Sequence, residues 1–180
     1  MTSITTIRIT RIEAAQRQLE TALELWFAGG EPVSIHSLAA RAHQLVHDLN
    51  RKSNGPELLF DSSVIKQESK KKIVAMMKEC QNFFKHADFR KGNKGDAIEF
   101  DPTTLSETFF LMTIKGMGYL GYVPTPLHTA FMAWATVHRS EWLSDSVQVI
   151  HNSIPVEVID GIRAYSRSDF LDAFNKQRIR

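Results

Sequence analysis

The chain has 180 residues, of which 43% are hydrophobic and 23% are charged, with a net charge of +2. This composition excludes a disordered protein and suffices for one domain with a full core, because a chain of this size buries roughly 70% of its unfolded surface. A charge balance so close to neutral gives no overall attraction to nucleic acid, so any nucleic-acid site must be a local basic patch.

The chain contains one cysteine, Cys80, so it can form neither an internal disulfide nor a cysteine-based zinc site. Its start lacks the basic and apolar segments of a secretory signal, and no apolar run long enough to span a membrane occurs. We therefore expect a cytoplasmic protein without membrane contact, folded as a single α-helical domain over residues 1–180.

The N-terminal segment is predicted to be an arm followed by a helix. Residues 1–10 are β-prone, but no second strand candidate accompanies them, so we predict an extended arm that could pair as an edge strand in a homodimer. Thr10 and Glu13 have the form of a capping box, and apolar residues then recur at helical spacing. This pattern predicts a helix over residues 11–28.

Apolar stripes continue through two further predicted helices. Ser34 is predicted to cap a helix over residues 35–52, and Gly55 lies at its stop. The longest helix is predicted over residues 64–87, because its apolar residues gather on one face.

The rest of the chain is predicted to hold one long loop and further helices. Residues 88–102 are polar and show neither the helical nor the strand spacing of apolar residues, so they are predicted to form the loop. Pro102 and Pro126 each mark a helix start, since proline is tolerated at the first helical position. Two short helices are predicted after Pro155, with Ser168 capping the second. The predicted fold is therefore all-α, a bundle of about five main helices with short C-terminal helices.

Residues 116–121 spell Gly-x-Gly-x-x-Gly, the fingerprint of dinucleotide binding. That chemistry requires a strand before the glycines and a helix that begins at them. Here a predicted helix precedes them and two prolines follow. We therefore predict that these glycines end the fourth helix and let it pack closely, and we expect no cofactor.

Three histidines share one stripe of the second predicted helix. His36, His43 and His47 lie within roughly 40° of one another around the helix, opposite its apolar stripe. They are therefore expected to face solvent, another helix or a partner subunit. They can form a polar face, a metal site completed by other helices, or proton-linked contacts. We expect no bound metal, because one helix supplies too few ligands.

A polar segment at the end of the third predicted helix is the strongest candidate site. Its cations suit the negative end of the helix dipole, which is a purely structural explanation. In the functional interpretation, His86 is an acid, a base or an anion binder. Asn82, Asp88 or Glu79 orients it, while Arg90, Lys91 and Lys94 supply charge for phosphate. The candidate catalytic residues are His86 and Asn82, and the candidate binding residues are Lys85, Asp88, Arg90, Lys91 and Lys94.

The chain resembles an uncharacterised bacterial family of all-α proteins through residues 12–19, 32–38 and 82–88. This resemblance covers most of the chain and implies no established activity. More distantly, the chain is similar to the HEPN superfamily of all-α bundles, which are often dimeric and include many ribonucleases and toxin or defence proteins.

The HEPN signature places histidine four to six residues after an arginine, near the end of a long helix. Here Gln81 stands in the arginine position before His86, and a neutral side chain cannot stabilise the charge of the phosphorane transition state. Arg41 and His47 also have this spacing, but no polar residue follows Arg41.

The HEPN resemblance implies a homodimeric module that binds RNA, a nucleotide or a protein partner without catalysis. The alternatives are a metal-dependent bundle enzyme that uses the three histidines of the second helix, and a purely structural or interaction protein.

Overall fold

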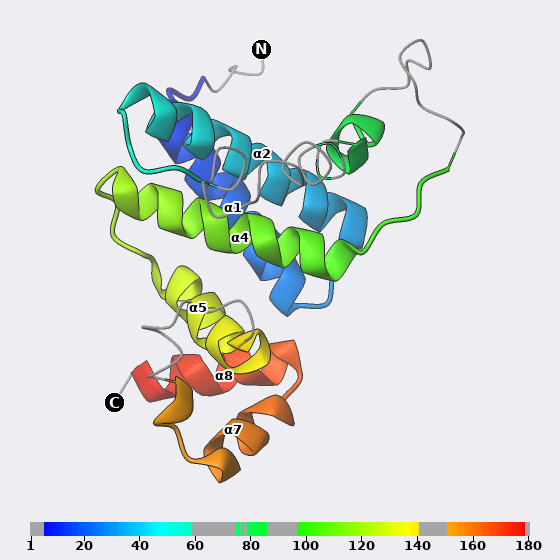
Figure 1. Cartoon of the computed structure of the whole chain (residues 1–180), viewed down its shortest axis with the longest axis vertical. Helices are drawn as coiled ribbons and strands as arrows, with labels where there is room; N and C mark the ends of the chain where they lie inside the picture. The colour runs from blue at the N-terminus through cyan, green and yellow to red at the C-terminus, as the bar shows by residue number, and fades with distance from the viewer. Residues whose placement is uncertain are drawn as a thin grey trace, which may run out of the picture.

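The computed structural model describes residues 6–58, 75, 77, 79–85, 97–140 and 151–178. These residues contain helices and no strand, so the predicted all-α fold is confirmed (Figure 1). The helices are α1 (Arg11–Phe27), α2 (Pro32–Lys52), α4 (Pro102–Tyr119), α5 (Pro126–His138), α7 (Val156–Arg163) and α8 (Arg167–Arg178). None of the described helices is long and apolar enough to cross a membrane.

Helix α2 lies between α1 and α4 and packs against both of them. Figure 1 shows these three helices together in one half of the molecule, with α5 leading away to α7 and α8. Helices α5 and α8 also contact α1, so the C-terminal helices share the main core. At the centre of this core Trp26 meets Phe27, Phe110, Phe131 and Trp134 edge-on, with ring centroids 4.6 to 6.2 Å apart.

The predicted cap of α1 is correct, and the predicted cap of α2 is wrong. Thr10 and Glu13 form the predicted capping box, in which each residue's side chain accepts a hydrogen bond from the other's backbone N–H. Helix α2, however, begins at Pro32, and Ser34 lies in its first turn. Glu31 is the cap, because its carboxylate reaches the backbone N–H groups two and three residues later, at 2.9 and 2.7 Å.

The later helices begin at the expected prolines, with one cap displaced. Asp101 caps α4 and Thr125 caps α5, each just before a proline. The last helix starts at Arg167, so the predicted cap, Ser168, lies within its first turn. Ser166 takes that role, because its hydroxyl accepts the backbone N–H of residue 169 at 3.1 Å.

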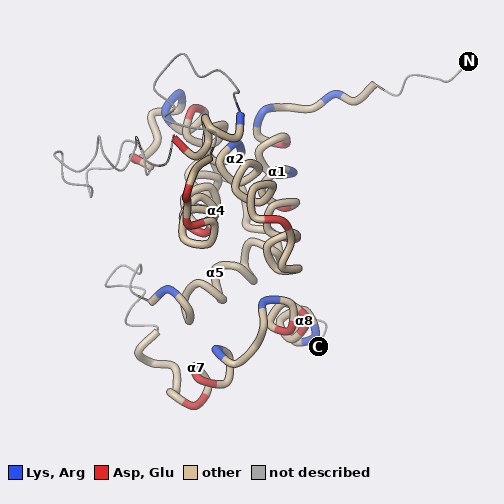
Figure 2. The backbone as a smooth tube through the Cα atoms, turned by 90° about the vertical axis from the view of Figure 1, so that its right-hand side faces the viewer, with Lys and Arg blue, Asp and Glu red and all other residues tan. Residues whose placement is uncertain are grey.

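Two predicted irregular segments are described in part. Residues 6–10 lie outside any helix and are exposed, and Figure 2 shows them running away from α1. Residues 97–100, at the end of the predicted loop, are also non-helical. Of the third predicted helix, residues 79–83 are helical and residues 84–85 form a turn, while most of its other residues lie outside the described ones.

The glycine fingerprint spans the end of α4, as predicted, and its first glycine allows close packing. A Cβ on Gly116 would lie 2.6 Å from Val46 Cγ1 and 2.7 Å from Leu58 Cδ1, so α4 can approach α2 this closely only with glycine. Gly121 follows the end of the helix with φ of +83°, a conformation that favours glycine.

We expect Gly116→Ala to destabilise the protein by about 2 kcal/mol, since overpacking a tight core contact usually costs roughly 1–3 kcal/mol. Gly118→Ala is the matched control, because a Cβ at this neighbouring helical position would meet nothing within 4 Å. Alanine is the better helix former, so the control should leave stability unchanged or raise it by roughly 0.5–1 kcal/mol. Urea unfolding measures both; equal stability of the two variants would contradict the tight contact.

Candidate functional site

The candidate segment predicted from the sequence is described only in part. Asn82 lies in the helical stretch 79–83 and Lys85 in the turn after it, and both side chains are exposed. The other predicted site residues, His86, Asp88, Arg90, Lys91 and Lys94, lie outside the described residues.

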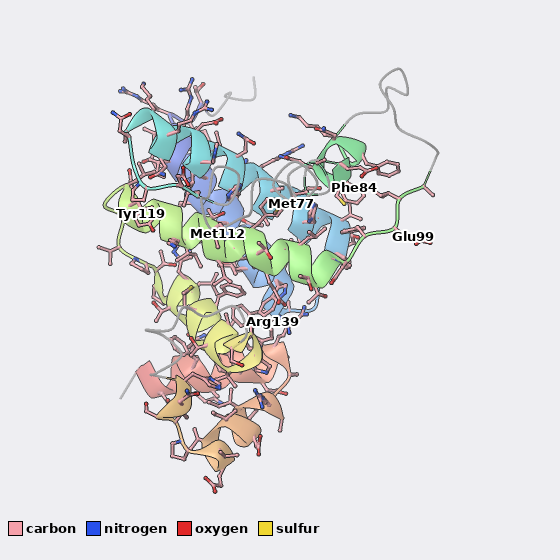
Figure 3. The ribbon with its side chains drawn as sticks, viewed as in Figure 1. Met77, Phe84, Glu99, Met112, Tyr119 and Arg139 are labelled. Atoms are coloured by element: carbon pink, nitrogen blue, oxygen red, sulfur yellow. The ribbon has the colours of Figure 1, made fainter. Side chains whose placement is uncertain are left out.

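Phe84 attaches this segment to the rest of the molecule. Its half-buried ring lies edge-on to His36 of α2 at 5.9 Å and to Phe100 at 5.0 Å between centroids. Figure 3 shows Phe84 on the short helical segment beside the first turns of α2. This contact fixes residues 81–85 against α2.

Arg41 of α2 lies next to this segment. Together with Ser37, Gln81, Phe84 and Lys85 it lines a small surface hollow of about 10 Å³. The hollow has room for about one water molecule, so a larger ligand would lie across it rather than inside it. Arg41 and Lys85 are both exposed, and within the described part of the chain neither forms an ion pair. The structure therefore brings a guanidinium beside Gln81, the position at which the sequence lacks one.

The three histidines of α2 are buried, which corrects the expectation of a polar, solvent-facing stripe. His36 and His43 are 0% exposed and His47 is 6% exposed. The physical reason is that α4 covers the side of α2 that lies away from its apolar stripe. Of the predicted options, the histidines face another helix: both His36 and His43 contact Phe109 of α4, at 5.5 and 5.2 Å between ring centroids.

Among the described residues, the ring contacts of His36 are apolar. Its ring lies between Phe84, Phe100 and Phe109, with centroids 5.5 to 5.9 Å away. Neither ring nitrogen has a hydrogen-bond partner among the described residues. Burial lowers the pKa of His36 to about 4, so the ring is neutral at pH 7.

The described residues contain no group of three His, Cys, Asp or Glu side chains placed to hold a metal ion. His36 and His43 are seven residues apart on one helix, which separates them by about 10 Å along its axis. His43 and His47 lie closer, with ring centroids 6.0 Å apart. That the protein binds no metal remains a prediction for elemental analysis.

A buried charge cluster is the feature that sequence reasoning missed. Glu107 of α4 is 0% exposed, and its Oε2 accepts a hydrogen bond from Arg139 Nε at 2.8 Å. Its Oε1 lies 3.9 Å from a terminal nitrogen of Arg167. Burial raises the pKa of the Glu107 carboxyl, and the two guanidinium groups oppose that rise. One carboxylate thus joins α4 to the end of α5 and the start of α8, where Figure 3 labels Arg139.

Aromatic rings support both arginines of this cluster. The Arg167 guanidinium lies 4.2 Å above the centroid of Trp26, and that of Arg139 lies 5.6 Å from Trp134. The rings of Trp26 and Trp134 are themselves in edge-on contact at 4.6 Å. Cation–π contacts of this kind attract the guanidinium groups and restrict their positions.

Arg167 also forms part of the wall of a pocket of about 200 Å³. The pocket lies where the end of α1 meets the starts of α2, α4 and α8. It is lined by Trp26, Gly29, Gly30, Pro32, Ile35, Pro102, Thr103 and Arg167.

One signal of the buried charge cluster was present in the sequence. Glu107 occupies a core position of α4, three residues before the buried Phe110 and seven before the buried Ile114.

Comparison of the chain with protein-family models, with curated proteins and with solved structures found no match. The functional argument therefore rests on the geometry of the chain itself.

Proposed function

We propose that the protein is a cytoplasmic, homodimeric, HEPN-like helical module that binds the phosphate backbone of single-stranded RNA without cutting it. The observation that carries this proposal is the position of Arg41 and Lys85, two exposed cations that line the same surface hollow. Guanidinium and ammonium groups that form no ion pair with a described residue are suited to phosphate oxygens. Asn82, exposed on the same segment, adds an amide that can bind sugar or phosphate.

The proposed absence of cleavage follows from the lack of a positive charge at Gln81. RNA cleavage by a 2′-hydroxyl requires a proton acceptor and a positive charge at the phosphorane, and Gln81 supplies no charge. Arg41 lies beside Gln81 but belongs to a different helix, so we assign it to phosphate binding in the ground state. The cleavage arm of the following experiment tests this assignment.

Binding of labelled single-stranded RNA should weaken as salt rises, and Arg41→Gln/Lys85→Gln should reduce that salt dependence. Each lost phosphate contact removes about 0.7 from the slope of log affinity against log salt, so the double variant should lose about 1.4. At low salt its affinity should fall roughly tenfold or more. Fluorescence anisotropy at several salt concentrations measures both quantities, and light scattering gives the number of chains per particle, which we expect to be two.

The matched control is Arg51→Gln/Lys52→Gln, which removes two exposed cations from the other end of α2. This variant should bind RNA like the natural chain. If both double variants lose affinity equally, the binding depends on net charge alone and the site is wrong. RNA cleavage that disappears in His86→Ala would contradict the non-catalytic assignment.

A further inference from the structure

The pocket between α1, α2, α4 and α8 presents an arginine whose hydrogen-bonding capacity the described residues leave unused. Arg167 has five N–H donors, yet among the described residues its contacts are the Glu107 carboxylate at 3.9 Å and the face of Trp26. At 3.9 Å the ion pair is too long for a hydrogen bond. The side chain is 33% exposed and lines the pocket. Its donors can therefore reach a ligand without breaking a hydrogen bond that the described residues supply.

Arg167 is also held in place, which distinguishes it from an ordinary surface arginine. The ring of Trp26 lies beneath its guanidinium, and the buried Glu107 lies at its edge. Glu107 is fixed in turn by the 2.8 Å hydrogen bond from Arg139. A guanidinium positioned before the ligand arrives loses little rotamer entropy on binding, which favours affinity.

Thr103 contributes a second polar group on the pocket wall. Its side chain is half-buried, and its hydroxyl forms no hydrogen bond with any described residue. The backbone N–H groups at the starts of α2 and α4 are not the donors for a ligand, because the carboxylates of Glu31 and Asp101 already accept hydrogen bonds from them. The available donors are therefore the side chains of Arg167 and Thr103.

The rest of the wall is apolar, and the pocket is small. Pro32, Ile35 and Pro102 face it together with the two glycines that follow α1. Drug-sized sites occupy roughly 300–1,000 Å³, so a pocket of about 200 Å³ selects a smaller molecule. The walls therefore suit a short apolar body that carries one anionic group.

Charge balance indicates a singly charged group. The positive charges of Arg139 and Arg167 are offset by the negative charges of Glu107 and Asp101. The pKa of Asp101 is lowered first by its hydrogen bonds to the first turn of α4 and then by the charge of Arg139. The charges of these four described groups thus sum to zero, and a doubly charged phosphate would be repelled by both carboxylates. A carboxylate carries one charge and matches the planar fork of arginine.

We propose that this pocket binds a small organic carboxylic acid, with its carboxylate on Arg167 and Thr103 and its apolar body against Pro32 and Ile35. This proposal is independent of the RNA-binding proposal, because the two sites share no residue.

The test is calorimetric titration with sodium benzoate, sodium acetate and inorganic phosphate at constant ionic strength. Benzoate should bind saturably at one site per chain, acetate more weakly for lack of an apolar body, and phosphate not measurably. Arg167→Gln should lose at least tenfold in benzoate affinity, and Thr103→Val, which keeps the shape of the side chain, severalfold. Arg167→Lys should lie between the natural chain and Arg167→Gln, because it keeps the charge without the fork.

Arg17→Gln is the control, because it removes an exposed arginine on α1 away from the pocket. Arg41→Gln/Lys85→Gln should also bind benzoate normally, which separates this test from the RNA experiment. The benzoate-induced rise in Tm, measured for every variant, distinguishes lost binding from lost folding. The proposal is overturned if benzoate fails to saturate the natural chain, if phosphate binds in its place, or if Arg17→Gln loses as much affinity as Arg167→Gln.

Discussion

Replacing Arg139 with methionine is expected to destabilise the protein by about 3–5 kcal/mol, because it leaves the Glu107 carboxylate buried without its hydrogen-bonded partner. Glu107 is 0% exposed, and Arg167, at 3.9 Å, is too distant to replace the 2.8 Å hydrogen bond. Urea unfolding at pH 8 measures the loss. Arg163→Met is the control, because the exposed Arg163 bonds a backbone carbonyl at 3.3 Å and, among the described residues, no carboxylate. It should cost less than about 1 kcal/mol.

Two further measurements separate this electrostatic effect from lost packing. Adding Glu107→Leu to Arg139→Met should restore most of the stability, since a buried ion pair can often be exchanged for apolar residues at little cost. The loss should also shrink at pH 5. Burial holds the folded pKa of Glu107 above its unfolded value, so its cost grows as pH rises through the folded pKa. A loss that is equal at both pH values and persists in the double variant would identify packing as the cause.

The stability of the natural chain should fall as pH drops from about 6.5 towards 4, and His36→Leu should weaken that fall. The pKa of His36 is about 4 in the folded state, against an ordinary value of 6.5. Between these two pH values the His36 ring is protonated in the unfolded chain but neutral in the folded chain, so acid favours unfolding. At pH 5 this effect amounts to about 2 kcal/mol relative to pH 8.

Urea unfolding of both proteins at pH 8 and pH 5 provides the comparison. His128 and His138 also have lowered pKa values, chiefly through burial, and Glu107 acts in the opposite sense, but all three groups are common to both proteins. The difference between the two pH dependences therefore isolates His36, whose ring contacts with described residues are to three uncharged phenylalanines. Parallel pH dependences would mean that His36 gains a proton in the folded protein as easily as in the unfolded one.

Local patterns predicted the class of the fold and most of its helix starts. Apolar spacing and the capping box located α1, and the residues before Pro102 and Pro126 cap their helices. The cap errors arise where two residues compete within one turn. The carboxylate of Glu31 accepts the N–H groups of Val33 and Ser34, so the cap lies three residues before the predicted cap at Ser34. At α8, Ser166 precedes the predicted cap Ser168 by two positions.

The candidate site was harder to predict, because it depends on which helices become neighbours. An amphipathic pattern assumes one buried face, but α2 lies between α1 and α4 and is buried on two sides, which places His36 in the core. The hydrogen-bond partner of Glu107 lies 32 residues away along the chain, so no local motif connects them. Arg41 likewise meets Gln81 only through the docking of Phe84 on α2.

The long separation of Arg167 from Trp26 along the chain determines the order in which the core can close during synthesis. Trp26 leaves the ribosome well before the arginine that covers its ring, which belongs to α8. At usual rates of translation the interval is on the order of ten seconds, far longer than helices need to form. During that time the tryptophan face and the carboxylate of Glu107 lack one of their partners. A nascent chain that stops before α8 therefore exposes an aromatic surface, which makes it a substrate for chaperones.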